Sequence, residues 1–107
     1  MNGYVYLLCE WGEELRYKIG RSKNDPRQRI KELSTGNSNE IILVNYYQSE
    51  NYAKVEKWLH NQYKNKRTDG GQEWFTLNEF DVLGFLKKCK EADETINLLL
   101  KENPFYK

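Results

Sequence analysis

Hydrophobic and polar residues alternate along two short stretches near the N-terminus. Val5 and Leu7 share one face of the first predicted strand, and Tyr6 lies on the other face. Residues 15–21 alternate in the same way, with Lys18 on the polar face. The short glycine-containing segment between the two stretches is typical of a turn. We therefore expect an antiparallel hairpin that presents Tyr6 and Lys18 on the same face.

Longer patterns predict one further strand and several helices. Residues 40–47 are rich in β-branched side chains, which predicts a third strand that is central and covered on both faces. A helix should start with the aspartate and proline at 25–26 and end near residues 34–36. Residues 52–64 have helical hydrophobic spacing. The sequence thus predicts an α+β fold with a small, mostly antiparallel three-stranded sheet flanked by helices.

Another helix should begin near residue 78 and pack on the core. Its hydrophobic residues are Phe80, Val82, Leu83, Phe85, Leu86 and Cys89. Trp74 and Phe75, just before it, are also typical of a core. Residues 94–102 either continue this helix or fold back, and their leucines cover the core or contact a partner, such as a second copy of the chain. We expect a folded domain over residues 1–90 and a helical tail over 91–107.

Charge is distributed unevenly along the 107 residues. The net charge is only +1, yet the segment 16–31 contains seven lysine and arginine residues and a single aspartate. A local basic patch of this kind favours contacts with phosphates, as in DNA binding. A solvated basic face with no partner has the same composition.

The sequence has few features of a secreted or membrane protein. Its two cysteines, Cys9 and Cys89, fit neither a disulfide framework nor a short-spaced metal site. No apolar run approaches the roughly 20 residues that a bilayer requires, and the N-terminus enters a strand directly, without a signal peptide. We expect an intracellular protein, cytoplasmic or nuclear, with no membrane partner.

Glu56 is an unusual residue in the second predicted helix. It falls within the buried stripe that Val55 and Leu59 define, where an unpaired carboxylate is costly. Either a salt bridge to Arg29 or Lys18, or a bound cation, would satisfy it, and the two alternatives are compatible. A histidine follows one turn later.

Four segments occur in an informative order along the chain. They are Gly3-Tyr4-Val5-Tyr6, Tyr17-Lys18-Ile19-Gly20-Arg21, Asp25-Pro26-Arg27-Gln28-Arg29 and Gly70-Gly71-Gln72-Glu73-Trp74-Phe75. Together they resemble the motifs of the GIY-YIG endonuclease superfamily, and most closely a branch first described from a phage open reading frame. The resemblance extends from Gly3 to about Phe85 and implies a GIY-YIG-like fold, and the C-terminal helical extension lies beyond it.

The resemblance implies a metal-dependent DNA endonuclease. The side chains that it assigns to catalysis are Tyr6 as general base, Lys18 and Arg29. His60, one turn after Glu56, would support them by a hydrogen bond to a phosphate or to a metal-bound water. The residues that it assigns to substrate binding are Tyr4, Tyr17, Gly20 and Arg21. Glu56 would hold one Mg²⁺ or Mn²⁺ ion. Because a tyrosine is neutral near neutral pH, a cation must favour its phenolate, and Lys18 on the same face is the expected one.

A second function of a different class is compatible with the same residues. A lone domain of this type also suits a catalytically inactive accessory module that binds nucleic acid on the same fold. A module that contacts another protein through the leucine-rich tail is a third alternative.

Overall fold

The computed structural model of the chain describes residues 2–12, 14–34, 40–68 and 73–102. Part of the predicted end of the first helix, residues 35–36, lies outside these ranges, as do Gly70, Gly71 and Gln72 of the last motif.

An antiparallel sheet forms the centre of the molecule. Its strands, in spatial order, are β3 (Glu40–Ser49), β1 (Gly3–Trp11), β2 (Leu15–Ser22) and β4 (Trp74–Phe75). The predicted hairpin of β1 and β2 is present, with Leu7 opposite Ile19. The predicted α+β class is confirmed, and the short fourth strand adds to the three that were predicted.

The prediction that the third strand is central was wrong. β3 lies at the edge of the sheet and pairs only with β1 among the described residues. Exposed and half-buried side chains alternate along it, and Ile42, Val44 and Tyr46 are exposed. The central position belongs to β1, whose Val5, Leu7 and Leu8 are completely buried. A β-branched strand need not be covered on both faces, because strand order depends on contacts that are distant in sequence.

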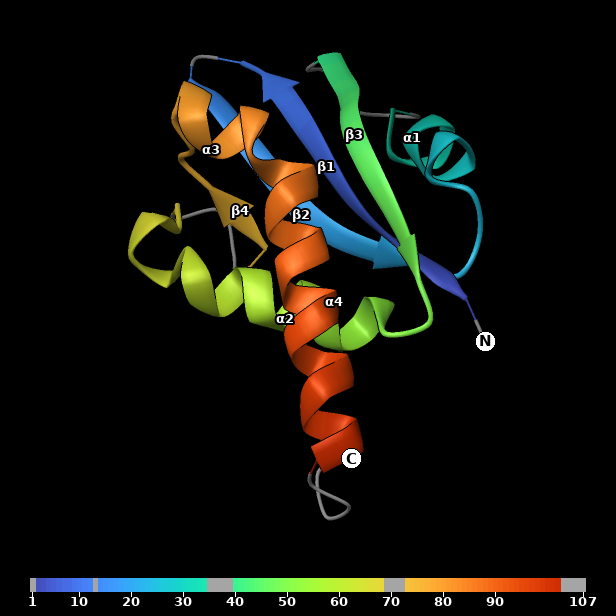
Figure 1. Cartoon of the computed structure of the whole chain (residues 1–107). Helices are drawn as coiled ribbons and strands as arrows, with labels where there is room; N and C mark the ends of the chain where they lie inside the picture. The colour runs from blue at the N-terminus through green and yellow to red at the C-terminus, as the bar shows by residue number, and fades with distance from the viewer. Residues whose placement is uncertain (1, 13, 35–39, 69–72, 103–107) are drawn as a thin grey trace.

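The helices are α1 (Pro26–Ser34), α2 (Tyr52–Gln62), α3 (Glu79–Leu83) and α4 (Phe85–Glu102), and a short 3₁₀ turn, η1 (Lys64–Lys66), follows α2. In Figure 1, α4 crosses in front of the sheet, α2 runs through the lower part of the view next to α4, and α1 lies beside β3. In the residues described, none of these helices has both the length and the hydrophobicity that crossing a bilayer requires.

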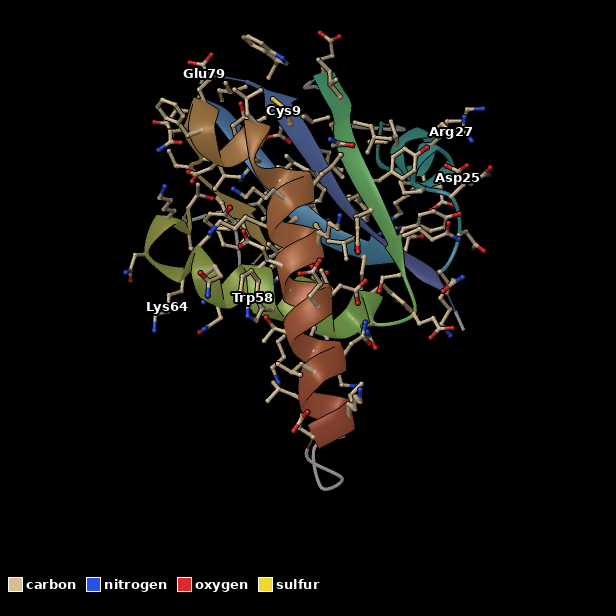
Figure 2. The ribbon with its side chains drawn as sticks, viewed as in Figure 1. Cys9, Asp25, Arg27, Trp58, Lys64 and Glu79 are labelled. Carbon is tan, nitrogen blue, oxygen red and sulfur yellow. The ribbon has the colours of Figure 1, made fainter. Side chains whose placement is uncertain are left out.

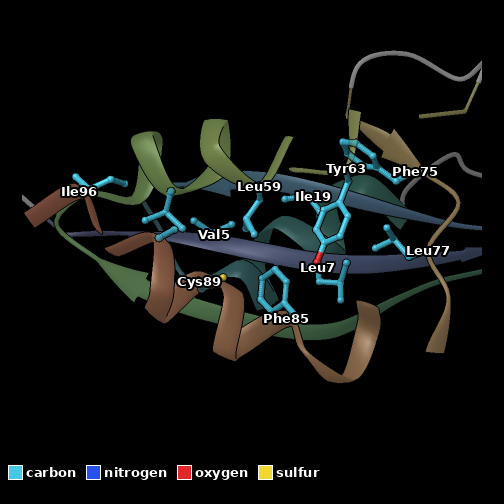
Figure 3. Close-up of a cluster of buried hydrophobic side chains, with 12 residues drawn as sticks. Val5, Leu7, Ile19, Leu59, Tyr63, Phe75, Leu77, Phe85, Cys89 and Ile96 are labelled. Atoms are coloured by element: carbon cyan, nitrogen blue, oxygen red, sulfur yellow. The ribbon is translucent and has the colours of Figure 1, made fainter. Parts of the chain in front are cut away.

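The hydrophobic core lies between one face of the sheet and the helices α2 and α4 (Figure 3). Its fully buried members include Ile19 from β2, Leu59 from α2, Phe75 from β4 and Cys89 from α4. Burial of each large aliphatic or aromatic side chain contributes about 1.5–3 kcal/mol. Tyr17, which the resemblance assigned to substrate binding, packs against this cluster from β2.

The predicted helix over residues 78–89 is divided in two at Gly84. Asn78 and Asp81 form a capping box that starts α3, and α4 begins just after Gly84. Because the chain changes direction between α3 and α4, the two helices present different faces to the core. Phe85 is buried, whereas Phe80 and Leu83 are 84% and 77% exposed. The prediction that Phe80, Leu83 and also Leu86, 44% exposed, pack on the core was wrong.

Over residues 91–102 the predicted tail is a direct continuation of α4, and residues 103–107 of that prediction lie outside the described ranges. Ala92 and Ile96 belong to the same core as β1 and α2, whereas Leu98 and Leu99 are exposed. The helix therefore crosses residue 90, the boundary predicted between domain and tail. Contact of the exposed leucines with a second copy or another protein stays a prediction.

Candidate active site

Tyr6 and Gly20 are partners across the β1–β2 ladder. The Tyr6 ring is only 2% exposed, and it lies so close over Gly20 that a Cβ atom there would be 2.5 Å from the Tyr6 Cζ atom. The phenol thus extends across β2 toward the far side of that strand, in space that only glycine leaves open. β4 pairs with Tyr17 and Lys18 and does not continue past Gly20 in the described part of the chain.

Arg29 is the cation at the Tyr6 hydroxyl. It lies on α1, and its hydrogen bond to Tyr6, followed by its bond to Glu32, raises the pKa of the guanidinium. The Arg29 Nη1 atom is 3.2 Å from Glu32 Oε2. Because Tyr6 points away from the core face that Leu7 occupies, this contact places the α1 arginine on the opposite face of the sheet.

The start of α1 is fixed by Asp25, as the sequence predicts. Its Oδ1 atom accepts a hydrogen bond of 2.9 Å from the backbone N–H of Arg27, and Pro26 is the first helical residue. Asp25 and Arg27 lie side by side at this end (Figure 2), with 2.6 Å between Oδ2 and Nη2. The hydrogen bonds from Arg27 lower the pKa of Asp25 to about 2. The cap thereby fixes the direction in which α1 presents Arg29.

Glu56 is buried on α2, on the core side of the sheet, with 8% of its surface exposed. Its Oε1 atom is 3.9 Å from Arg21 Nε, whereas its buried Oε2 atom has no hydrogen-bond partner among the residues the structure describes. Burial raises the pKa of the carboxyl, and the charges of His60 and Arg21 oppose that shift. The predicted salt-bridge partners were Arg29 and Lys18; the structure gives Arg21 instead.

His60 lies one helical turn beyond Glu56 and faces the same edge of β2. Its Nε2 atom is 2.7 Å from the backbone carbonyl of Ile19, so the Nε2–H tautomer donates to that oxygen. The ring also packs on Phe75, with 5.3 Å between ring centroids. His60 thus anchors α2 to β2 beside Gly20 and contributes to the electrostatics of Glu56.

Lys18 shares the sheet face of Tyr6 but pairs with another group. Its Nζ atom is 3.4 Å from Glu73 Oε2, at the entrance of β4. Glu73 in turn raises the pKa of Glu56 by charge repulsion, which places it in the same electrostatic environment. Glu73 belongs to the last of the four motifs but is not among the residues to which the resemblance assigned a role.

A pocket of about 210 Å³ opens between the end of β2 and α1. Its lining residues are Arg21, Ser22, Asn24, Gln28, Arg29 and Glu32. Two guanidinium groups, two amides and a hydroxyl suit an anion such as a phosphate. Arg21 belongs both to this pocket and to the Glu56 pair, so it connects the Arg29 side of the site to the Glu56 side. The sequence did not predict Ser22, Asn24 or Gln28 here, because they converge only in the fold.

Two of the predicted substrate-binding residues lie elsewhere. Tyr17 faces the core opposite Cys9, and Tyr4 packs edge-on against Tyr46, with 6.0 Å between their ring centroids. Tyr4 lies on the same face of β1 as Tyr6, whereas Tyr17 lies on the opposite face from that tyrosine.

The residues present fit one hydrated divalent cation better than a metal held entirely by the protein. In the ranges described, no three His, Cys, Asp or Glu side chains are grouped for joint ligation. Glu56 nevertheless offers a buried carboxylate oxygen without a partner. Mg²⁺ is often bound by one or two carboxylates while it keeps several waters.

Comparison with known proteins gives one match. The T5orf172 domain matches residues 3–98, which is most of the chain and includes every residue of the site. No curated protein and no solved structure matches the chain significantly. The chain therefore belongs to the T5orf172 domain family.

Proposed function

We propose that this chain is a GIY-YIG-type endonuclease that hydrolyses DNA phosphodiester bonds with one divalent metal ion. The T5orf172 domain is associated with nucleases and DNA binding, which supports the reaction class. The observation that carries the proposal is the convergence around Gly20: Tyr6 with Arg29 arrives from one side of the sheet, and Glu56 with Arg21 arrives from the other.

Glu56 would hold the cation, Mg²⁺ or Mn²⁺. Its orphan Oε2 atom and its burial support this role, since a bound cation would satisfy a group that the protein alone leaves unpaired. When bound, the metal would supply stabilisation of the charge that develops on the leaving oxygen.

Tyr6 acts as the general base and takes the proton from the attacking water. The guanidinium of Arg29 donates a hydrogen bond to its hydroxyl. Arg29 therefore occupies the position beside Tyr6 that the sequence assigned to Lys18, and Lys18 contributes positive charge to the same face. Deletion of the hydroxyl removes the base without removing the ring that packs over Gly20.

Arg21 and Arg29 neutralise the phosphate that undergoes attack, from the pocket that both line. His60 holds the edge of β2 in place through the Ile19 carbonyl, one helical turn from Glu56. Water enters in line with the leaving oxygen, and the products are a 5′-phosphate and a 3′-hydroxyl.

A plasmid-nicking assay with Mg²⁺ or Mn²⁺ tests the proposal. We expect the wild type to nick supercoiled DNA, and Tyr6→Phe, Arg29→Ala and Glu56→Ala each to lose at least about a hundredfold in rate, as removal of a transition-state contact commonly does. Arg27→Ala is the matched control, because this arginine lies on the same helix but pairs with Asp25 outside the pocket.

Each outcome of the assay has a distinct meaning. Cleavage that persists in all three variants would show that the residue assignment is wrong. Binding of DNA by the wild type without any cleavage would instead identify the accessory nucleic-acid-binding module.

A further inference from the structure

Trp74 differs from the core residue that its sequence context predicts. It is half-buried, and the guanidinium carbon of Arg16 lies over its ring, 4.1 Å from the centroid. The Lys18 ammonium is also close, 5.8 Å from that centroid. These two cations are paired with Glu10 and Glu73, and the guanidinium stacked on the partly exposed indole makes it a surface feature instead of a core side chain.

Arg16 is held in place over the indole from below. Its Nε atom is 2.7 Å from Oε1 of Glu10, which is only 6% exposed, whereas 31% of the Arg16 side chain is exposed. The carboxylate is therefore hidden in the sheet, and the group presented to solvent is a planar cation. This geometry favours a planar, electron-rich or anionic ligand above it.

The stack lies on the same face of the sheet as the base of the proposed reaction. Trp74 is the cross-strand partner of Lys18, and Tyr6 is the partner of Gly20, two residues further along β2. The Tyr6 hydroxyl lies over Gly20, which is the diagonal neighbour of Trp74 across β2 and β4, and diagonal neighbours on one sheet face lie about 7–8 Å apart. That separation is comparable to the length of one nucleotide in an extended strand.

We propose that Arg16 and Trp74 form a stacking platform for one unpaired base that flanks the phosphodiester at Tyr6. Aromatic rings and arginine planes bind bases of single strands in this way, whereas a base inside a duplex has no free face to offer. The platform selects a single-stranded or locally opened nucleic acid. This inference rests on the nucleic-acid substrate of the proposed function and extends it to specificity.

Tryptophan fluorescence in the absence of divalent metal tests the platform directly. Trp11→Phe with Trp58→Phe leaves Trp74 as the single tryptophan of the chain. The two probes are a short oligothymidine and an abasic oligomer with the same number of phosphates. We expect oligothymidine to quench Trp74 in a saturable way and to bind about tenfold more tightly than the abasic oligomer, since one stacked base contributes on that order.

Variants separate stacking from charge. Because Trp74→Leu removes the fluorophore, the affinities of the variants are measured by the anisotropy of end-labelled oligomers. Trp74→Leu and Arg16→Gln should each lose about tenfold in affinity for oligothymidine while binding of the abasic oligomer by Trp74→Leu stays unchanged. Phe80→Leu is the control, because this aromatic residue is 84% exposed on α3, which carries no residue of the site. Should Trp74→Leu fail to fold, Trp74→Phe, which keeps a ring, should retain part of the preference for bases.

Equal affinity for the two probes without quenching would overturn the platform. If the wild type still nicks DNA in that case, the nuclease stands and only the stacking fails. If quenching and the base preference appear but no nicking is found with metal, the platform stands in a protein that binds without cleaving. Failure of both probes to bind would overturn the platform as well.

Discussion

The backbone at Gly20 determines where the Tyr6 hydroxyl lies. The phenol ring occupies the space of the missing side chain, and Arg29 donates to the hydroxyl beyond it. The resemblance assigned Gly20 to substrate binding, but it did not show that the group lying over this glycine is another residue of the site itself. A local requirement for glycine thus becomes a requirement of the proposed chemistry.

Gly20→Ala should displace Tyr6 and weaken both folding and cleavage. The new methyl group meets the ring at 2.5 Å from Cζ, and such overpacking costs about 1–3 kcal/mol of unfolding free energy. We expect cleavage to fall by about a hundredfold, because small displacements of reacting groups have effects of that size. Denaturant unfolding and the nicking assay measure the two effects.

A double-mutant cycle provides the control for this substitution. In a Tyr6→Ala background the ring is absent, so the stability cost of Gly20→Ala should shrink strongly. A cost that is the same in both backgrounds would show that Gly20 acts through its own backbone and not through Tyr6.

At the scale of elements, a polar network clamps α4 to the junction of β3 and α2. The carboxylate of Asp93 accepts hydrogen bonds from Tyr47, Ser49 and Asn51, at 2.8, 2.9 and 2.8 Å. Asn51 directly precedes α2, the helix that carries Glu56. The C-terminal helix therefore supports the position of the helix that carries Glu56, although it contributes no side chain to the site described above.

Asp93→Ala should lower the free energy of unfolding by about 2–3 kcal/mol, because three donors lose a charged acceptor. Glu94→Ala, an exposed change on the same helix, should have little effect.

Burial and the Asp93 hydrogen bond raise the pKa of Tyr47 from 10.0 to about 12, so this tyrosine stabilises the fold below pH 10 and loses that contribution as the pH rises through 12.

Alkaline unfolding monitored by circular dichroism checks the titration. The wild type should lose more stability than Tyr47→Phe between pH 10 and 12, since phenylalanine has no proton to release. Parallel curves for the two proteins would contradict the assignment of this network.

Element by element, the sequence was informative where the determinants are local. The β1–β2 hairpin follows from alternation, and the start of α1 follows from its aspartate cap and its proline. β4 was not predicted because two residues carry no periodicity, and the edge position of β3 depends on strand order. The exposed side of α3 depends on the break at Gly84, which a continuous helical pattern conceals.

For the whole molecule, the site is assembled from contacts that no local pattern contains. The sequence singled out Glu56 because a carboxylate interrupts a buried stripe, and the structure confirms its burial. It could not identify Arg21 as the partner, or the pocket between β2 and α1, because these depend on how α1 and α2 reach β2 from opposite faces. The proposed site is a property of the assembled sheet and helices together.

A site of this kind should reduce the stability of the molecule as a whole. The folded-state pKa of Glu56 is raised by burial, so its carboxyl favours folding at low pH and this contribution is lost as the pH rises through that pKa. At neutral pH the buried charge lowers the free energy of unfolding, and functional sites commonly retain destabilising groups of this kind. Glu56→Gln should therefore stabilise the metal-free protein at pH 7 by on the order of 1 kcal/mol, and the difference should disappear below pH 4.5.

The most direct measurement compares Glu56→Gln with the wild type in thermal unfolding and in metal-dependent cleavage on the same preparations. We expect the metal-free variant to melt at a higher temperature than the wild type at pH 7. Mg²⁺ should stabilise the wild type, which cleaves DNA, whereas the variant should gain no stability from Mg²⁺ and should no longer cleave. A variant that cleaves DNA as fast as the wild type would contradict the claim that Glu56 holds the metal of a nuclease.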